Sequence, residues 1–459
     1  MNKKTVIITS LILIAIISRL ILLDIRPLHH DEGVNYFFAD NILEGRGFKY
    51  DPLNYHGPSY FFFLFLSFFV LGISEFSLRF PAALFGIILS ISPLFLKDRK
   101  ISNKYIVSLG FILSPSLLFY SRYSIHESLF ISLGFLAIYI LIRMIEKKDI
   151  SFLPYFSILL AFLFTTKETI TILGLIMAVI CLANYKEIKQ IQFSSKTIIA
   201  SLIIFLSIYI ILFTSFFSNF PGLVDSIKGY FPWTVRVFSE PGHIKPFLYY
   251  IDLIAKYELP LLLLSILGLF YAYKNRDNIF AKSISIWFIL IFLIYSLISY
   301  KTPWLVVNLT LPMVLMASIG LYSLKDYPKL KYLLSVLTLV YLLTFSIYLN
   351  FVNPWQKSNG FAYVHTDKDI LNLVDELNLK YTNTDKIIIV SDVYWPLPFY
   401  LDNKNVEYLD RVDKANYSSG HDFYIVKDAI FQNTSLPEDY HSSKYLLRED
   451  ENLHLVYKN

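Results

Sequence analysis

Long apolar runs separated by short polar segments fill the first 350 residues of the chain. The first run follows Lys3 and Lys4 and extends to Leu23, which is long enough to cross a bilayer as a helix. No small-residue cleavage site precedes Asp24, so we expect this helix to be retained and not removed as a signal peptide. The pattern predicts further spans at roughly 79–96, 104–120, 128–145, 151–166, 169–184, 197–217, 258–273, 283–300, 304–323 and 332–350, about eleven in all.

The distribution of basic residues predicts how these spans are oriented. We expect the apolar stretch 59–73 to lie in the outer leaflet without crossing, inside an external loop over 24–78. Only then do the basic clusters all face the cytoplasm, as the positive-inside rule requires. These clusters lie at 3–4, 97–104, 143–148, 186–196, 274–282 and 325–331. The N-terminus is then cytoplasmic and the C-terminal region extracytoplasmic.

After residue 350 the pattern changes to that of a small soluble α/β unit. Residues 367–377 have apolar side chains at helical spacing, and 386–390 and 423–426 are typical of buried strands. The predicted fold class is therefore a mainly α-helical polytopic membrane protein with a small C-terminal extracytoplasmic α/β domain. We place the boundary so that 1–350, including the loop 24–78, is the transmembrane domain and 351–459 the soluble one.

Composition and charge agree with this division. The chain is 55% hydrophobic with a mean hydropathy of +0.51, above the apolar content usual for soluble domains. Residues 351–459 hold 17 acidic against 11 basic residues, and the rest of the chain 19 against 30. This asymmetry indicates charges sorted across a bilayer and argues against nucleic-acid binding. The single cysteine, Cys181, excludes an intramolecular disulfide.

The segment 29–36, directly after the first span, is the most concentrated group of titratable residues. It brings His30, Asp31 and Glu32 together where a membrane helix should emerge into water. Adjacent acids can shift each other's pKa values, which suits one of them for proton transfer. The structural alternative is a helix start, with an acidic residue complementing the dipole of a helix over 34–44.

Other external junctions are also short and polar. Each has an ordinary explanation, because lysines snorkel and tryptophans favour membrane interfaces. Together they place acids, bases and imidazoles on one face, whereas the cytoplasmic loops offer mostly lysine and arginine. The candidate binding residues at these junctions are His56, Arg122, His126, Glu127, Lys167, Glu168, Lys301 and Trp304.

A polyprenyl-phosphate sugar fits such a site, because its head group meets the outer face while its tail stays in the bilayer. Transfer of the sugar needs a base for the acceptor and cations for the departing phosphate. The sequence contains no nucleotide-binding motif, and the region after residue 350 has no metal-ligand spacing. We therefore expect no cofactor, leave a divalent metal ion open, and disfavour a nucleotide-sugar donor.

The layout resembles the GT-C glycosyltransferases, especially the protein O-mannosyltransferase-like group and an archaeal branch associated with N-glycosylation. The segments that carry the resemblance are Asp31-Glu32, His56-Gly57-Pro58-Ser59-Tyr60, Ser121-Arg122-Tyr123, Lys167-Glu168-Thr169, Lys301-Thr302-Pro303-Trp304, Tyr363-Val364-His365-Thr366 and Trp395-Pro396-Leu397-Pro398-Phe399-Tyr400.

By this resemblance Asp31 is the catalytic base of an inverting transfer, with Glu32 as its partner. The family often has a basic residue before Pro-Pro that touches the lipid phosphate; here His56 occupies that position and Gly57 replaces the first proline. Arg122 and Lys301 are the candidates for a fixed positive charge on the phosphate.

Three function classes remain at this stage. The first is a glycosyltransferase that uses a polyprenyl- or dolichyl-phosphate sugar, with the bilayer and a glycan or protein acceptor as partners. The second is a flippase or flippase-associated factor for lipid-linked sugars, which predicts polar groups through the membrane, whereas the charges here lie near its surfaces. The third is a scaffold that presents the C-terminal domain, and it leaves the Asp31 segment unexplained.

Overall fold

The structure is a computed structural model that describes residues 2–53, 56–96, 102–239, 243–409 and 423–458. The expected basic loop at 97–104 therefore lies mostly outside the described residues. The chain divides into two compact units, one of Met1–Leu23 with Asn41–Val352 and one of Asp24–Asp40 with Asn353–Asn459. This division differs from the expected boundary, because 24–40 belongs with the C-terminal segment and not with the helical unit.

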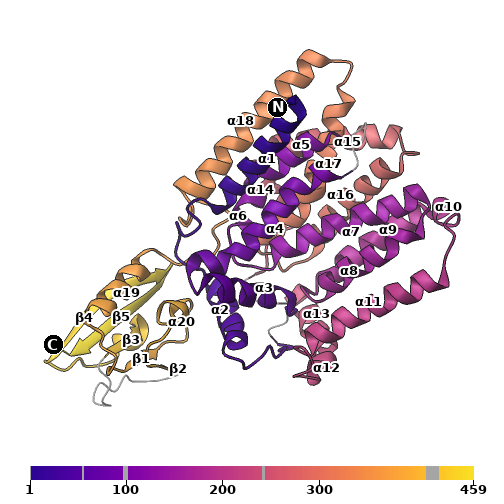
Figure 1. The fold of residues 1–459 in the computed structure, drawn as a ribbon. Helices are drawn as coiled ribbons and strands as arrows, with labels where there is room; N and C mark the ends of the chain where they lie inside the picture. Colours follow the sequence, from indigo (N-terminus) through magenta and orange to yellow (C-terminus); the bar gives the residue numbers. More distant parts are fainter. Residues whose placement is uncertain (1, 54–55, 97–101, 240–242, 410–422, 459) are drawn as a thin grey trace. The chain divides into compact units, whose positions relative to one another are not determined.

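The helical unit forms a helix from every apolar segment that the sequence pattern predicts (Figure 1). The helices that open it are α1 (Lys3–Leu20), α3 (Ser59–Leu71), α4 (Glu75–Phe95), α5 (Lys104–Leu113), α6 (Pro115–Tyr120), α7 (Glu127–Lys147), α8 (Leu153–Phe164) and α9 (Ile170–Ala183). The later ones are α10 (Tyr185–Ile188), α11 (Ser195–Phe213), α12 (Pro221–Lys228), α13 (Tyr230–Ser239), α14 (Tyr249–Tyr257), α15 (Leu259–Lys274), α16 (Ile279–Leu297), α17 (Val306–Ser323) and α18 (Pro328–Ile347). Short 3₁₀ turns precede α8 and α17, and a π-helical turn follows α18.

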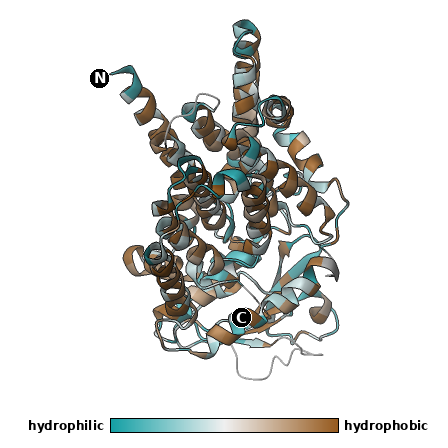
Figure 2. Ribbon diagram, turned by 90° about the vertical axis from the view of Figure 1, so that its right-hand side faces the viewer, coloured by the Kyte–Doolittle hydropathy of each residue, from teal (hydrophilic) through white to brown (hydrophobic). Residues whose placement is uncertain are grey.

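The chain is a multi-pass membrane protein. Among the described residues, six helices are long and apolar enough to span a bilayer, and the bent pair α14–α15 would be a seventh. Figure 2 shows how apolar the helices of this unit are. Shorter apolar helices occur at Ser59–Leu71, Lys104–Leu113, Ile150–Phe164 and Ile170–Ala183. The expected count of about eleven spans stays a prediction.

Helix α3 is short for a membrane span. Its 13 residues extend about 20 Å at 1.5 Å per residue, less than the ~30 Å of a hydrocarbon core. Helices α8 and α9, with 12 and 14 residues, are of similar length although they are expected to cross, so the placement of 59–73 in one leaflet stays a prediction.

Helix α17 is the centre of the helical unit. Its span is 94% buried, whereas those of α11 and α18 are 11% and 17% buried. Two glycines let α15 and α17 approach closely: a Cβ on Gly268 would lie 2.1 Å from the Met316 carbonyl oxygen, and one on Gly320 would lie 2.0 Å from that of Leu264. The exposed apolar faces of α11 and α18 suit contact with lipid.

A buried carboxylate ties the broken helices of this unit together. Glu258 lies where α14 and α15 bend by 109°. Its oxygens accept hydrogen bonds from the hydroxyls of Ser114 (2.6 Å), Ser116 (2.9 Å) and Thr310 (2.9 Å). Ser114 and Pro115 form the break between α5 and α6. The Glu258 side chain therefore links this break, the bend between α14 and α15, and α17.

The second unit is a five-stranded mixed sheet with short helices. Its strands are β1 (Ile387–Val390), β2 (Val406–Leu409), β3 (Phe423–Lys427), β4 (Tyr440–Arg448) and β5 (Glu451–Lys458), in the order β2-β1-β3-β5-β4. Strand β1 pairs in parallel with β2 and β3, and β5 pairs antiparallel with β3 and β4. Its helices are α2 (His30–Leu43), α19 (Asp369–Lys380), α20 (Leu397–Tyr400) and α21 (Asp428–Phe431).

Successive side chains of the buried strands point to opposite faces of the sheet, so each face has its own apolar core. Ile387 and Ile389 face the core that includes the apolar side of α19, and Ile388 and Val390 face the one beside Ile430. The predicted helix at 367–377 and the predicted strands at 386–390 and 423–426 are all present. The sequence pattern did not predict β2, β4 or β5.

Candidate functional site

Asp31 lies in the first turn of α2, in the unit that contains the C-terminal segment. Its side chain is 38% exposed, whereas Glu32 beside it is fully buried. The Glu32 carboxylate accepts a hydrogen bond from the backbone N–H of His29 at 3.0 Å. Of the two acids, Asp31 is therefore the one whose carboxylate can meet a substrate.

His30, the first residue of α2, is partly covered. Its ring lies edge-on to that of Trp395, with 6.2 Å between centroids. Burial, together with the charge of Arg448, lowers the pKa of His30 to about 4. His30 is therefore a neutral imidazole at neutral pH and supplies no fixed positive charge for a phosphate.

Three turns of the helical unit are joined before α3, α7 and α9. Gly57 N–H donates to the Thr166 carbonyl oxygen at 3.0 Å, and Ser59 N–H to that of Thr165 at 2.9 Å. The hydroxyls of Tyr60, on α3, and Ser124, in the turn before α7, lie 3.0 Å apart and form a hydrogen bond. This bond connects the third turn to the other two. A Cβ at Gly57 would lie 2.1 Å from the Thr165 oxygen, which explains why glycine occupies this position.

These joined turns bring five of the predicted residues into one group, which we call the acid–base cluster: His56, His126, Glu127, Lys167 and Glu168. Lys167 and Glu127 form a buried ion pair. Nδ1 of His56 lies 3.7 Å from Glu168 Oε2, and the Tyr50 hydroxyl donates to Glu168 Oε1 at 3.0 Å. His56 has a φ of +134°, a backbone conformation that residues other than glycine rarely adopt.

His126 is the most enclosed member of the cluster. Its ring centroid lies 4.6 Å from that of His56 and 4.8 Å from that of Tyr60. Burial and the nearby His56 and Lys167 hold the pKa of His126 well below its ordinary value. Burial and the neighbouring Glu168 carboxylate likewise raise the pKa of the Tyr50 phenol. The cluster thus combines an ion pair, a second carboxylate and neutral donors.

Arg122 has a different role from the expected phosphate contact. Its guanidinium donates to the carbonyl oxygens of Ser18, Arg19, Ile21 and Leu22, at distances of 2.6 to 3.2 Å. These carbonyls end α1 and have no partner within the helix. The structure therefore assigns Arg122 to capping α1.

Lys301 is buried just before the 3₁₀ turn that contains Trp304. Its ammonium donates to the carbonyl oxygens of Ile298 and Lys245. Burial lowers the pKa of Lys301. No carboxylate lies within ion-pair distance of this ammonium in the described part of the chain, so two of its three N–H groups have protein acceptors and its charge is not neutralised there.

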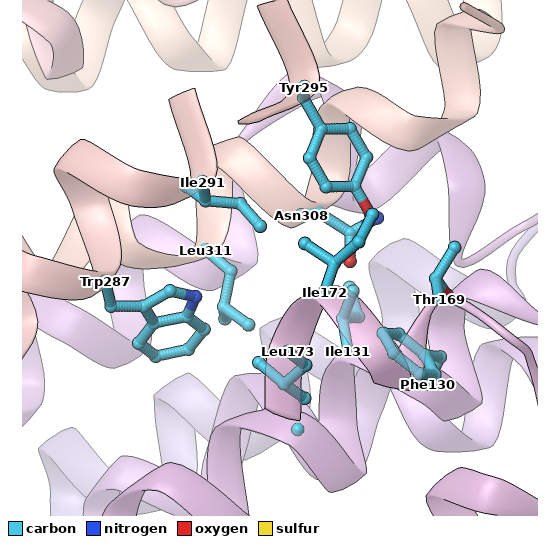
Figure 3. A pocket seen from close by; sticks show the side chains of 11 residues that line it. Phe130, Ile131, Thr169, Ile172, Leu173, Trp287, Ile291, Tyr295, Asn308 and Leu311 are labelled. Atoms are coloured by element: carbon cyan, nitrogen blue, oxygen red, sulfur yellow. The ribbon is translucent and has the colours of Figure 1, made fainter. Parts of the chain in front are cut away.

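A small apolar pocket, with room for about one water molecule, lies next to the acid–base cluster (Figure 3). Thr169, one of its lining residues, directly follows Glu168, and Phe130 lies one helical turn after Glu127. Figure 3 shows Tyr295, Asn308 and Thr169 on one side of the pocket, and Trp287, Leu311 and Leu173 on the other. The lining is therefore polar on one side and apolar on the other.

The comparisons with known proteins agree with this geometry. The sequence model described as dolichyl-phosphate-mannose-protein mannosyltransferase matches residues 55–212, about a third of the chain. The crystal structure of ArnT from Cupriavidus metallidurans bound to undecaprenyl phosphate superposes with a TM-score of 0.69, at 12% identity, over 98% of this chain and 97% of that one. The chain has the GT-C fold.

A second GT-C structure extends the comparison. The apo oligosaccharyltransferase of Archaeoglobus fulgidus superposes with a TM-score of 0.58, at 11% identity, over 92% of this chain and 69% of that one. A search of curated protein sequences finds no match. The predicted mainly α-helical membrane fold with a small C-terminal α/β unit is thus confirmed, and the extracytoplasmic placement of that unit stays a prediction. Residues 55–212 of this chain, which the mannosyltransferase family model matches, contain the whole acid–base cluster but not Asp31.

Two residues near the predicted ones were not predicted from the sequence. In the helical unit, the Tyr50 hydroxyl donates to Glu168, more than a hundred residues away, and no local pattern indicates such a contact. In the other unit, His29 Nδ1 accepts from the Asp31 N–H and the His29 N–H donates to Glu32, so His29 holds the start of α2. Among the described residues, no group of three or more His, Cys, Asp or Glu side chains is placed to hold a metal ion.

Proposed function

We propose that this protein is a glycosyltransferase that transfers a sugar from a polyprenyl-phosphate donor to an acceptor on the extracytoplasmic face of the membrane. The observation that carries the proposal is the acid–base cluster, built from three turns of the helical unit. Its charged and hydrogen-bonding groups suit a sugar phosphate. Undecaprenyl phosphate bound to ArnT and the match to a dolichyl-phosphate-dependent family support this donor class.

Lys301 is the residue that we propose for the donor phosphate. A buried ammonium with a remaining N–H can donate a charge-assisted hydrogen bond to a phosphate oxygen. It also stabilises the negative charge that the phosphate gains as the bond to the sugar breaks. Lys167 is less suited to this role, because Glu127 already neutralises it.

Asp31 is the proposed general base. In an inverting displacement the acceptor oxygen attacks the anomeric carbon on the face opposite the phosphate. The bond to the phosphate oxygen breaks, its electron pair stays on the polyprenyl phosphate, and the acceptor proton moves to the Asp31 carboxylate. Its partial exposure fits this role, and the burial of Glu32 fits a supporting one.

The basic clusters along the sequence support the orientation that we propose in the membrane. The N-terminus is cytoplasmic, and Asp31 and the C-terminal unit are extracytoplasmic. A reporter at the C-terminus that is accessible only from outside supports this orientation, and one accessible only from the cytoplasm overturns it.

The function is tested with purified protein and polyprenyl phosphates that carry a labelled sugar. Transfer of the label to an added acceptor, or to water, with release of polyprenyl phosphate supports the proposal. Movement of intact donor across a liposome membrane without cleavage would instead indicate the flippase alternative.

A further inference from the structure

The helix that bears Asp31 begins with an unusual cap. His29 directly precedes the first helical residue, His30. The backbone N–H of Asp31 donates to His29 Nδ1 at 3.1 Å, and the backbone N–H of His29 donates to Glu32 Oε2 at 3.0 Å. This is the reciprocal arrangement of a capping box, with an imidazole nitrogen in place of the usual serine or threonine oxygen.

The second ring nitrogen of His29 fixes which nitrogen carries the proton. Nε2 lies 2.9 Å from the carbonyl oxygen of Tyr363, which can only accept a hydrogen bond. Nε2 therefore carries the hydrogen, and Nδ1 is the nitrogen that accepts from the Asp31 N–H. Burial, with His365, His30 and Arg448 nearby, holds the pKa of His29 well below its ordinary value, so the ring stays neutral.

The C-terminal segment holds the same helix at further points. Leu28 N–H donates to the Tyr400 hydroxyl at 2.8 Å, and the rings of Tyr36 and Phe399 lie edge-to-face at 5.1 Å. A Cβ at Gly33 would lie 3.0 Å from Pro396, so α2 packs tightly against this proline. Asp31 thus lies on a helix that packs against the C-terminal segment.

We propose that His29 is a positioning residue for Asp31, through which the C-terminal domain fixes the catalytic carboxylate. The imidazole links the Asp31 backbone to the Tyr363 carbonyl, so the C-terminal segment holds the first turn of α2. The proposal rests on the proposed function for its catalytic consequence, and it gives the C-terminal domain a role in the reaction.

The test uses three substitutions that separate the two contacts of His29 in the full-length protein. His29→Asn places an oxygen near the position of Nδ1 and keeps the cap. His29→Gln places an amide N–H near the position of Nε2 and keeps only the Tyr363 contact. His29→Ala removes both. His441→Ala, on β4 in the same unit, is the control.

We expect kcat of His29→Ala to fall about 10- to 100-fold, because a displacement of about 1 Å can cost this much. The donor KM should change less than about threefold. His29→Asn should recover kcat to within about fivefold of wild type, and His29→Gln should resemble His29→Ala. A loss of stability alone would lower the amount of folded protein in these variants. It would not produce recovery of kcat in His29→Asn together with no recovery in His29→Gln.

Hydrogen exchange of the peptide around Asp31 gives a readout that does not depend on activity. Exchange should be faster in His29→Ala and His29→Gln, and near wild type in His29→Asn. If wild type transfers no sugar, the proposed function fails while this measurement still tests the cap. Unchanged kcat and exchange in His29→Ala, or equal effects of His29→Asn and His29→Ala, would overturn the proposal.

Discussion

The backbone N–H of Gly57 donates to the carbonyl oxygen of Thr166 at 3.0 Å, and this contact joins two turns that are more than a hundred residues apart. One of these turns carries His56 and the other carries Lys167 and Glu168. The acid–base cluster therefore depends on how closely the two backbones approach.

Gly57→Ala should disrupt this approach. The added Cβ would lie 2.1 Å from the Thr165 oxygen, so the turns must separate. We expect a clearly lower melting temperature and reduced donor binding. Gly174→Ala is the control, because a Cβ there has nothing within 4 Å. Equal melting temperatures for Gly57→Ala and Gly174→Ala would contradict the interpretation.

Replacing only Lys167 of the Glu127–Lys167 ion pair should destabilise the fold more than replacing both residues. Lys167→Met leaves a buried carboxylate without its cation, which typically costs about 3–5 kcal/mol. The double variant Glu127→Gln with Lys167→Met leaves no charge and should melt at a higher temperature than Lys167→Met alone. Thermal unfolding of the two variants in the same detergent decides this, and a double variant no more stable than the single one counts against a stabilising pair.

Lys301→Ala should weaken donor binding about tenfold or more, since a hydrogen bond to a charged group contributes about 1.5–3 kcal/mol. Arg122→Ala should instead lower the melting temperature with little change in donor affinity, because its guanidinium caps α1. Binding of a polyprenyl phosphate is measured for both, with Lys228→Ala as the exposed control. Loss of affinity in Arg122→Ala but not in Lys301→Ala would reverse these roles.

Acidification should destabilise the protein through its buried histidines. The pKa of His30 is lowered to about 4 and those of His29 and His126 are also lowered, whereas an unfolded chain has histidine pKa values near 6.5. The unfolded state therefore binds more protons below pH 6.5, and stability falls as the pH drops from 6.5 towards 4. The melting temperature of wild type should fall in this window, and that of His30→Gln should fall less. A melting temperature of wild type that stays constant from pH 6.5 to 5 would contradict this.

Much of the fold could be predicted from the sequence. Long apolar runs in a bilayer form helices because their backbone groups must hydrogen-bond within the segment. Each predicted segment is accordingly helical, however the helices pack. Strands β1 and β3 were recognisable because both their faces are buried, whereas β4 is polar in its first half and is more exposed. The grouping of 24–40 with the C-terminal segment was not predictable, because it rests on contacts between residues more than three hundred positions apart.

The candidate site was predicted in part. The expected orientation predicts that the polar turns share one face, and five residues from three of these turns do form one cluster. Arg122 shows the limit of this reasoning. A guanidinium at an external helix end has the same sequence context whether it meets a phosphate or the carbonyls of a neighbouring helix, and only the structure shows the latter.

The central claim is that Asp31 is the base of a sugar transfer from a polyprenyl phosphate. Its most direct test compares donor binding and donor turnover in wild type and in Asp31→Asn, with Asp40→Asn on the same helix as the control. We predict that Asp31→Asn binds the donor like wild type but releases polyprenyl phosphate about 10²- to 10⁴-fold more slowly, the loss typical of removing a general base. Turnover by Asp31→Asn at the wild-type rate would contradict the account.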